Sequence, residues 1–242
     1  MRVQSYLGPA AVALAALACN LPGGPPPATA TPLVLFTETA TTAPLPTDTP
    51  LPTPTGTPLV PIARPAEVGV NCRVGPGIDW KDISYLLVGQ TATIQGRNAD
   101  SSWWYVVTQQ DPGTPCWVAA SVTVTAGNVA ALPVIPKPQA VVTSVDLDLQ
   151  PRNQSLPGCF GPPQPIEFDG TITTNGPTEV TWHFETEDGG SMPSHTLEFD
   201  QYGTKGVDDS FLPTDWPGQF WVRLVVTEPN GKEVEKRYKI EC

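Results

Sequence analysis

A tract of 47 residues, from Asn20 to Ala66, constrains this chain more than any other feature, because 24 of these residues are proline or threonine. Only three residues in the tract carry a charge. Such a composition cannot bury enough apolar surface to offset the entropy that an ordered backbone loses. We therefore predict that residues 19–66 form a disordered linker, acting either as a spacer of extended polyproline character or as a simple tether.

The first 19 residues have the pattern of an export signal. One arginine is followed by a run of Leu, Ala and Val from Leu7 to Ala18, broken only by Gly8 and Pro9. This run is too short to span a bilayer but suits a signal peptide. The run ends in Ala16-Leu17-Ala18-Cys19, which resembles the lipobox of bacterial lipoproteins. The resemblance implies a signal peptide over residues 1–18 and a lipid anchor on Cys19. The alternative is ordinary cleavage after Ala18, with release of a soluble protein.

The number of cysteines favours the anchor. The chain has five cysteines, and four of them fall in pairs within two candidate domains, as Cys72 with Cys116 and Cys159 with Cys242. Exported proteins usually pair their cysteines, so we predict two disulfides within these domains, which leaves Cys19 free for a lipid. Close C-x₂-C pairs of the zinc-site type are absent from the sequence, and we expect neither a metal ion nor a cofactor. These features predict an exported protein, anchored to the membrane of the cell envelope on its extracytoplasmic side.

The charge of the chain disfavours two classes of partner. The net charge is −11, and residues 139–242 hold 17 acidic and 7 basic residues, whereas residues 67–138 hold 5 and 4. Binding to nucleic acid or to an anionic lipid surface requires a clustered basic patch, which the sequence does not contain. Spaced aspartates of the calcium-loop type are also lacking around Asp208 and Asp209. We interpret the acidity mainly as solvated strand faces.

Residues 67–132 show the alternation and turn spacing of a small all-β domain. Turn sequences such as Gly75-Pro76-Gly77 and Asp111-Pro112-Gly113 separate short runs of β-forming residues. The expected strands are Val68–Cys72, Tyr85–Val88, Thr91–Gly96, Trp103–Thr108, Cys116–Ala119 and Ser121–Thr125. This spacing predicts a small barrel.

An ordered series of motifs in this domain resembles the bacterial SH3-like (SH3b) family. The motifs are Val70-Asn71-Cys72-Arg73-Val74-Gly75-Pro76-Gly77, Leu87-Val88-Gly89-Gln90, Trp103-Trp104-Tyr105-Val106, and Cys116-Trp117-Val118 with Ala120-Ser121-Val122. The resemblance implies an SH3-like barrel that binds cell-wall peptidoglycan or another extracellular polymer. It also places the strands of Cys72 and Cys116 near each other, which supports a bridge between them. Arg73 is expected to donate hydrogen bonds to loop carbonyls.

Strand periodicity selects the candidate ligand contacts. If Trp104 and Val106 point into the core, Trp103 and Tyr105 face outward. Together with Trp80, these two aromatic residues are the candidate ligand-binding residues, since flat rings suit sugar or peptide faces. The alternative is that all three rings pack on adjacent loops.

The second domain, residues 139–242, follows a short linker of residues 133–138. Its apolar residues, among them Phe168, Phe184 and Leu224, keep even positions within each expected strand, while charged or polar residues mostly take the odd ones. About seven strands without a helical pattern predict a two-sheet, immunoglobulin-like sandwich. Asn175-Gly176-Pro177 and Pro229-Asn230-Gly231-Lys232 are expected hairpin turns. Cys242 shares its parity with Tyr238 and Ile240, so its sulfur is expected to point inward, toward Cys159.

Catalytic motifs are not apparent. The sequence contains two histidines, His183 and His195, and His183 is expected on the solvent side of its strand. It lacks the G-x-S-x-G, H-E-x-x-H and P-loop patterns. We predict a non-enzymatic surface lipoprotein that binds an extracellular polymer through exposed aromatic residues. The alternative is a structural or adaptor lipoprotein that binds a protein partner through the acidic sandwich.

Overall fold

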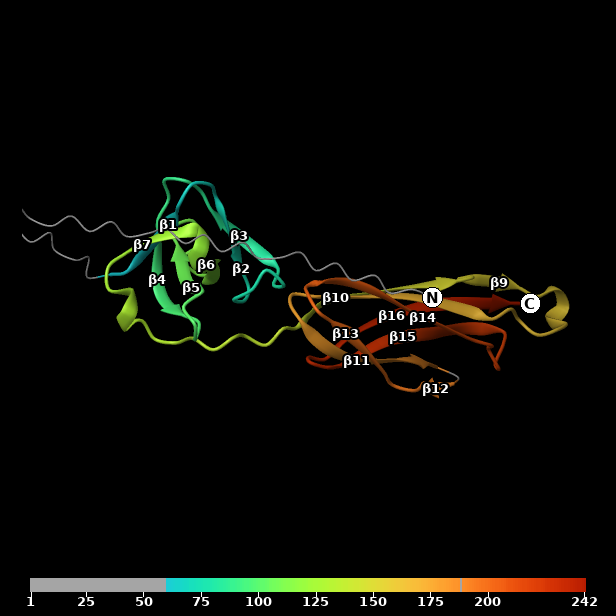
Figure 1. Cartoon of the computed structure of the whole chain (residues 1–242). Coiled ribbons are helices and arrows are strands. Elements are labelled where there is room, and N and C mark those ends of the chain that lie inside the picture. The colour runs from blue at the N-terminus through green and yellow to red at the C-terminus, as the bar shows by residue number, and fades with distance from the viewer. Residues whose placement is uncertain (1–59, 188) are drawn as a thin grey trace, which may run out of the picture. The chain divides into compact units, whose positions relative to one another are not determined.

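The computed structural model describes residues 60–187 and 189–242. The predicted signal peptide, the lipidation site Cys19 and residues 19–59 of the predicted linker lie outside this range. The described part is all-β, as predicted, and contains only short 3₁₀ turns besides its strands (Figure 1). Within it, we find no helix that is both long and apolar enough to cross a membrane.

The first domain is one bent sheet of seven strands, arranged in the order β3-β2-β6-β5-β4-β1-β7. The strand pairs are antiparallel, and a 3₁₀ turn at Ala120–Val122 precedes the last strand. The strands are β1 Ile62–Pro65, β2 Val70–Arg73, β3 Asp82–Leu86, β4 Ala92–Arg97, β5 Trp103–Thr108, β6 Cys116–Ala119 and β7 Thr123–Ala126.

The first domain starts earlier in the sequence than predicted, because it includes strand β1. Residues 62–65 were expected in the linker, but Ile62 pairs with β4, and all four residues of the strand pair with β7. Ala63 is fully buried in the core. The proline-rich composition concealed this strand, because Pro65 stands at its end, where a missing N–H donor is tolerated.

A small apolar core and one buried disulfide hold the first domain together. Trp104 and Val106 point into this core, as periodicity predicts. The predicted bridge between Cys72 and Cys116 is confirmed, with a Cα–Cα distance of 5.4 Å and both residues buried. The other buried members are Ala63, Val70, Leu86, Ala92, Ile94 and Val118.

The expected linker at residues 133–138 is hydrogen-bonded to the first domain. The backbone N–H of Arg97 donates to the carbonyl of Pro133 at 3.0 Å, and that of Ile135 donates to the carbonyl of Arg97 at 2.8 Å. A Cβ atom added to Gly96 would lie 2.3 Å from the Ile135 side chain. This segment is therefore bound along the end of β4, which composition alone does not indicate.

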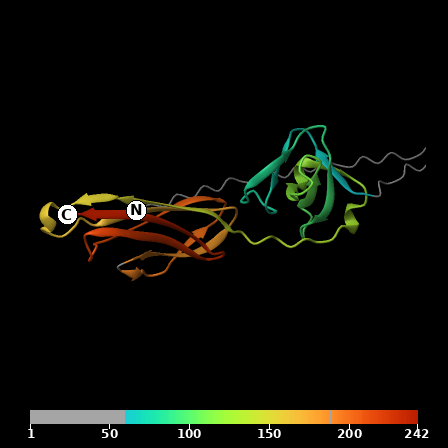
Figure 2. The ribbon, with the colours of Figure 1, turned by 180° about the vertical axis from the view of Figure 1, so that it is seen from behind.

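The second domain is a sandwich of two antiparallel layers (Figures 1 and 2). One sheet has the order β14-β10-β8; the other has the order β12-β11-β15-β16-β9, with β13 paired to β11. Only β9 runs parallel to its neighbour. The strands are β8 Val142–Gln150, β9 Asn153–Ser155, β10 Ile166–Thr174, β11 Thr178–Thr186, β12 Gly190–Ser191, β13 His195–Phe199, β14 Gly203–Phe211, β15 Gly218–Glu228 and β16 Lys232–Glu241.

The core between the two layers confirms the predicted alternation. Alternate residues of β10, β11 and β15 are buried, including Phe168, Phe184 and Leu224. Residues 229–232 form the predicted hairpin between β15 and β16. The turn at Asn175 and Gly176 is not a hairpin, because β10 and β11 belong to different sheets.

The second predicted disulfide, between Cys159 and Cys242, is also confirmed, with a Cα–Cα distance of 4.7 Å. Both cysteines are exposed, so the expectation that the sulfur of Cys242 points into the core is wrong. The reason is that β16 ends at Glu241, and side-chain alternation does not extend beyond the strand. The two disulfides together indicate an oxidising, extracytoplasmic compartment.

Candidate functional site

The three candidate aromatic residues have different environments. Trp103, on β5, is half-buried and lines an open groove on the first domain. Tyr105 is also half-buried, and its ring packs against that of Trp117 with a centroid distance of 5.1 Å. Trp80 is only 1% exposed, so its assignment as a ligand contact is wrong. Of the three, only Trp103 lines the groove.

The groove lies where β2, β5 and the 3₁₀ turn after β6 come together, and it encloses about 330 Å³. Its walls are mainly apolar, although Arg73 and Asn71 add polar groups. The remaining lining residues are Val68, Gly69, Val70, Ile78, Trp103, Ala119, Ser121 and Val122. An apolar cleft with a few polar groups at its edge is typical of a ligand site.

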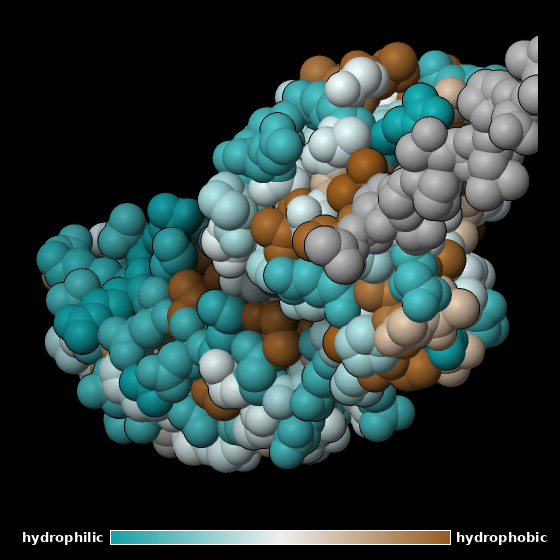
Figure 3. Space-filling model, turned by 90° about the vertical axis from the view of Figure 1, so that its left-hand side faces the viewer, coloured by the Kyte–Doolittle hydropathy of each residue, from teal (hydrophilic) through white to brown (hydrophobic). Residues whose placement is uncertain are grey.

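Three apolar residues of the groove were not predicted as ligand contacts. Ile78 is 80% exposed, Val68 is 67% exposed and Val122 is 43% exposed. In Figure 3, hydrophobic residues form several separate patches among hydrophilic ones. Val68 and Val122 were expected at the ends of strands, but Val68 precedes β2 and Val122 lies in the 3₁₀ turn Ala120–Val122. Ile78 follows the turn motif Gly75-Pro76-Gly77, to which strand periodicity does not apply.

Arg73 supports the wall of this groove. Its guanidinium Nη1 donates to the backbone carbonyl of Trp80 at 2.6 Å, which agrees with the expected structural role. The same side chain lines the groove, so it also provides the positive charge there. The groove can therefore contact apolar groups through Trp103 and Ile78 and a polar or anionic group through Arg73.

The two histidines and the cysteines of the described residues each contact a neighbouring side chain. His183 is not fully on the solvent side, because only 12% of its side chain is exposed, and its Nε2 lies 3.2 Å from Glu185 Oε1. The His195 ring stacks on Trp182 at 5.0 Å. All four cysteines of the described residues are in disulfides. In the same part of the chain, no group of three His, Cys, Asp or Glu side chains is placed to hold a metal ion.

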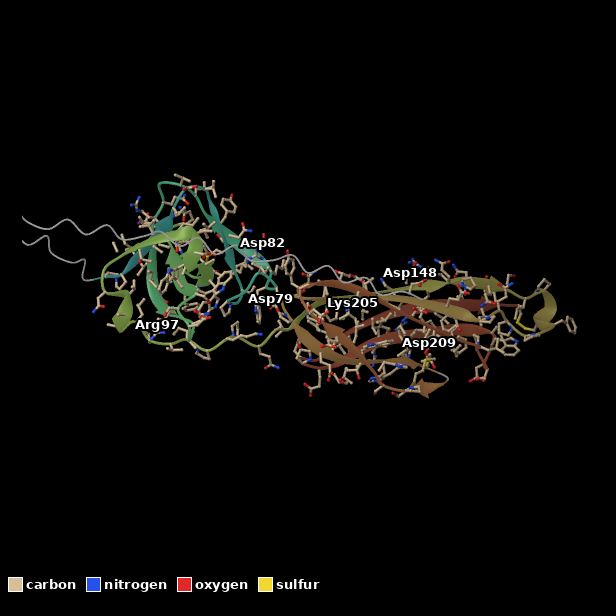
Figure 4. All side chains as sticks on the ribbon, viewed as in Figure 1. Asp79, Asp82, Arg97, Asp148, Lys205 and Asp209 are labelled. Carbon is tan, nitrogen blue, oxygen red and sulfur yellow. A yellow bond between two sulfur atoms is a disulfide. The ribbon has the colours of Figure 1, made fainter. Side chains whose placement is uncertain are left out.

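The outer face of the three-stranded sheet carries a row of carboxylates. Asp169 on β10 lies directly opposite Asp208 on β14 and Asp148 on β8. Figure 4 labels Asp148 and Asp209, on the two outer strands of this sheet. A hydrogen bond from Arg152 lowers the pKa of Asp148 and thereby favours its charged form. Like charges directly opposite each other destabilise a sheet, and the ion pair with Arg152 offsets part of this repulsion at Asp148.

A second charged cluster lies on the other sheet, around Arg223 of β15. Its guanidinium lies 3.1 Å from Glu235, 3.4 Å from Glu185 and 3.9 Å from Glu233. It also stacks over the Trp221 ring at 4.8 Å. The hydrogen bond from Arg223 lowers the pKa of Glu235. Arg223 thus lies close to three carboxylates on adjacent strands, and Arg237 also pairs with Glu235 at 3.2 Å.

This cluster predicts how the stability of the second domain responds to pH. A carboxyl group whose pKa is lowered by folding stabilises the fold above its unfolded pKa, and this contribution is lost as the pH falls. We therefore expect urea midpoints to fall between about pH 5 and pH 3, and to fall less steeply in Arg223→Met. Lys236→Met, which removes an exposed cation of β16, is the control. An identical pH dependence in the wild type and in Arg223→Met would contradict the role of the cluster.

Comparisons with known proteins show only broad likenesses. No family model matches this chain, and no curated protein matches it. Among solved structures, it is similar to the CARDB domain of a Pyrococcus furiosus protein in complex with di-metal ions, at 11% identity and a TM-score of 0.31, over 40% of this chain and 93% of that one. It is also similar to a Listeria innocua beta-glucosidase, at 10% identity and a TM-score of 0.30, over 41% and 16% of the two chains.

A third likeness is to the Parabacteroides merdae beta-glucuronidase, at 11% identity and a TM-score of 0.29. The match covers 75% of this chain and 25% of the enzyme. The chain thus spans only a small part of either glycosidase. At these TM-scores, the likenesses carry no argument about activity, metal binding or substrate.

Proposed function

We propose that this chain is a non-enzymatic surface lipoprotein, anchored through Cys19, whose first domain binds cell-wall peptidoglycan or another extracellular polymer. The observation that carries the proposal is the open groove, in which the half-buried Trp103 lies beside exposed apolar side chains and the cation of Arg73. A flat indole ring offers a large contact area to a sugar or peptide face at a low cost in side-chain entropy. The SH3b-like motifs point to the same class of ligand.

Two further observations support a binding role at the envelope. The two disulfides fit an extracytoplasmic location, in which a polymer of the cell surface is accessible. They also occupy all four cysteines of the described residues, whereas a cysteine peptidase needs a free cysteine as its nucleophile. Cys19 is the remaining cysteine of the sequence, and its position after an apolar run suits a lipid.

Replacement of Trp103 tests the groove directly. The full chain, extracted from membranes in detergent, is incubated with purified sacculi, and the retained fraction is measured by sedimentation. We expect Trp103→Ala to weaken retention about tenfold, the ratio that corresponds to roughly 1.4 kcal/mol for a central aromatic contact. Tyr85→Ala is the matched control, because Tyr85 is 62% exposed but does not line the groove. Equal losses in both variants, or no retention of the wild type, would overturn the proposal.

A second candidate function rests on the carboxylate row of Asp148, Asp169 and Asp208. Its negative charge suits a basic surface on a protein partner, and such complementarity increases the association rate and the specificity. The chain would then act as an adaptor whose first domain is a scaffold. Crosslinking in native membranes that recovers one specific protein, while sacculi retain nothing, would favour this function over polymer binding.

A further inference from the structure

Trp80 is buried without belonging to the core of the first domain. It lies near the end of the β2–β3 loop, residues 74–81. Figure 4 labels Asp79 and Asp82, which flank it in the sequence. Its ring packs under Gly75, where an added Cβ would approach the ring to 2.3 Å. The ammonium group of Lys137 lies 5.4 Å from the ring centroid. A side chain of this size, held against a loop, fixes the path of that loop.

The β2–β3 loop also forms one wall of the groove. Ile78 stands two residues before Trp80 and is 80% exposed in the groove wall. Arg73, at the start of the loop, donates to the Trp80 carbonyl, and the Val74 N–H donates to the Lys81 carbonyl at 3.0 Å. The positions of Ile78 and Arg73 therefore depend on the position of Trp80.

A further contact of Trp80 comes from the turn between β10 and β11. A Cβ added to Gly176 would lie 2.5 Å from the Trp80 ring, so only glycine fits there without a shift. The N–H of Lys81 donates to the Asn175 carbonyl at 3.0 Å. The side-chain oxygen of Asn175 accepts from the Val141 N–H at 2.8 Å, which fixes the turn itself. The N–H of Tyr202 adds a bond of 2.8 Å to the carbonyl of Asp79.

We propose that Trp80 is a positioning residue of the groove and that the turn of Asn175 and Gly176 is its partner. The second domain then contributes to ligand binding without touching the ligand, because it holds the loop that presents Ile78 and Arg73. This inference rests on the proposed polymer-binding function of the same groove. It predicts that a substitution in the second domain changes the affinity of the first.

Gly176→Ala in the full chain is the decisive variant, because it leaves every groove residue in place. Gly231→Ala is the matched control, since it lies in another turn of the same domain and a Cβ there would meet no atom within 4 Å. We expect Gly176→Ala to accelerate hydrogen exchange at the Lys81 amide about tenfold and to lower retention on sacculi several-fold. Gly231→Ala should change neither. Trp80→Phe, which keeps a smaller ring, should shift both readouts in the same direction.

The two readouts separate failure of this inference from failure of the proposed function. Unchanged exchange at Lys81 in Gly176→Ala would overturn the inference, whatever the retention. Faster exchange with full retention would also overturn it, because the loop would then not position the groove. Absence of retention in the wild type overturns the proposed function, whereas exchange at Lys81 still shows whether the turn holds the loop.

Discussion

Replacing Phe168 with alanine should lower the free energy of unfolding of the second domain by about 3–5 kcal/mol, the usual effect of removing a buried aromatic ring. Phe168 lies on β10 and is 1% exposed between the two sheets. Its ring meets those of Phe184 at 5.1 Å and Phe211 at 5.7 Å. The substitution thus removes contacts with both layers and leaves a cavity that the sheets cannot close. Because domains of this size are stable by only about 5–15 kcal/mol, a large fraction of the molecules should unfold at moderate temperature.

The matched control is Phe160→Ala. Phe160 is 85% exposed, next to the surface disulfide, and its loss should change stability by less than about 0.5 kcal/mol. Urea denaturation followed by tryptophan fluorescence measures both variants. A small effect of Phe168→Ala would show that the core does not depend on this ring.

Removing the disulfide of the first domain should have an effect of similar size. The bridge closes a chain separation of 44 residues, for which the chain-entropy model gives about 4 kcal/mol. Cys72 and Cys116 are also buried in a small core, so the double variant Cys72→Ala with Cys116→Ala loses packing as well. We expect the melting transition of this domain to fall by at least about 10 °C, as differential scanning calorimetry would show.

A comparison with the second disulfide distinguishes the contribution of chain entropy from that of packing. Cys159 and Cys242 close a longer chain separation of 83 residues. For this length the same model gives a stabilisation that is about 0.6 kcal/mol larger. Both residues are exposed, so their replacement by alanine removes little packing. If the buried pair nevertheless proves no more costly than the exposed pair, packing around Cys72 and Cys116 contributes little, and loop length dominates.

The sequence by itself determined the all-β class and both cysteine pairs. These features depend on local rules: alternate residues of a strand face opposite sides, and the cysteines of an exported domain pair with each other. The burial of Phe168, Phe184 and Leu224 and the outward direction of Trp103 followed from alternation alone. Where the strand ends, as at Cys242, the rule no longer held.

Only the tertiary structure decided which side chains form the groove and what supports it. Trp80 has the appearance of a ligand contact in the sequence, yet Gly75 and Gly176, one of them about a hundred residues away, cover its ring. The groove residues Val68, Ile78 and Val122 come from turns separated along the chain. Contacts between distant turns depend on how complete sheets pack, and a periodic pattern within one strand carries no information about them.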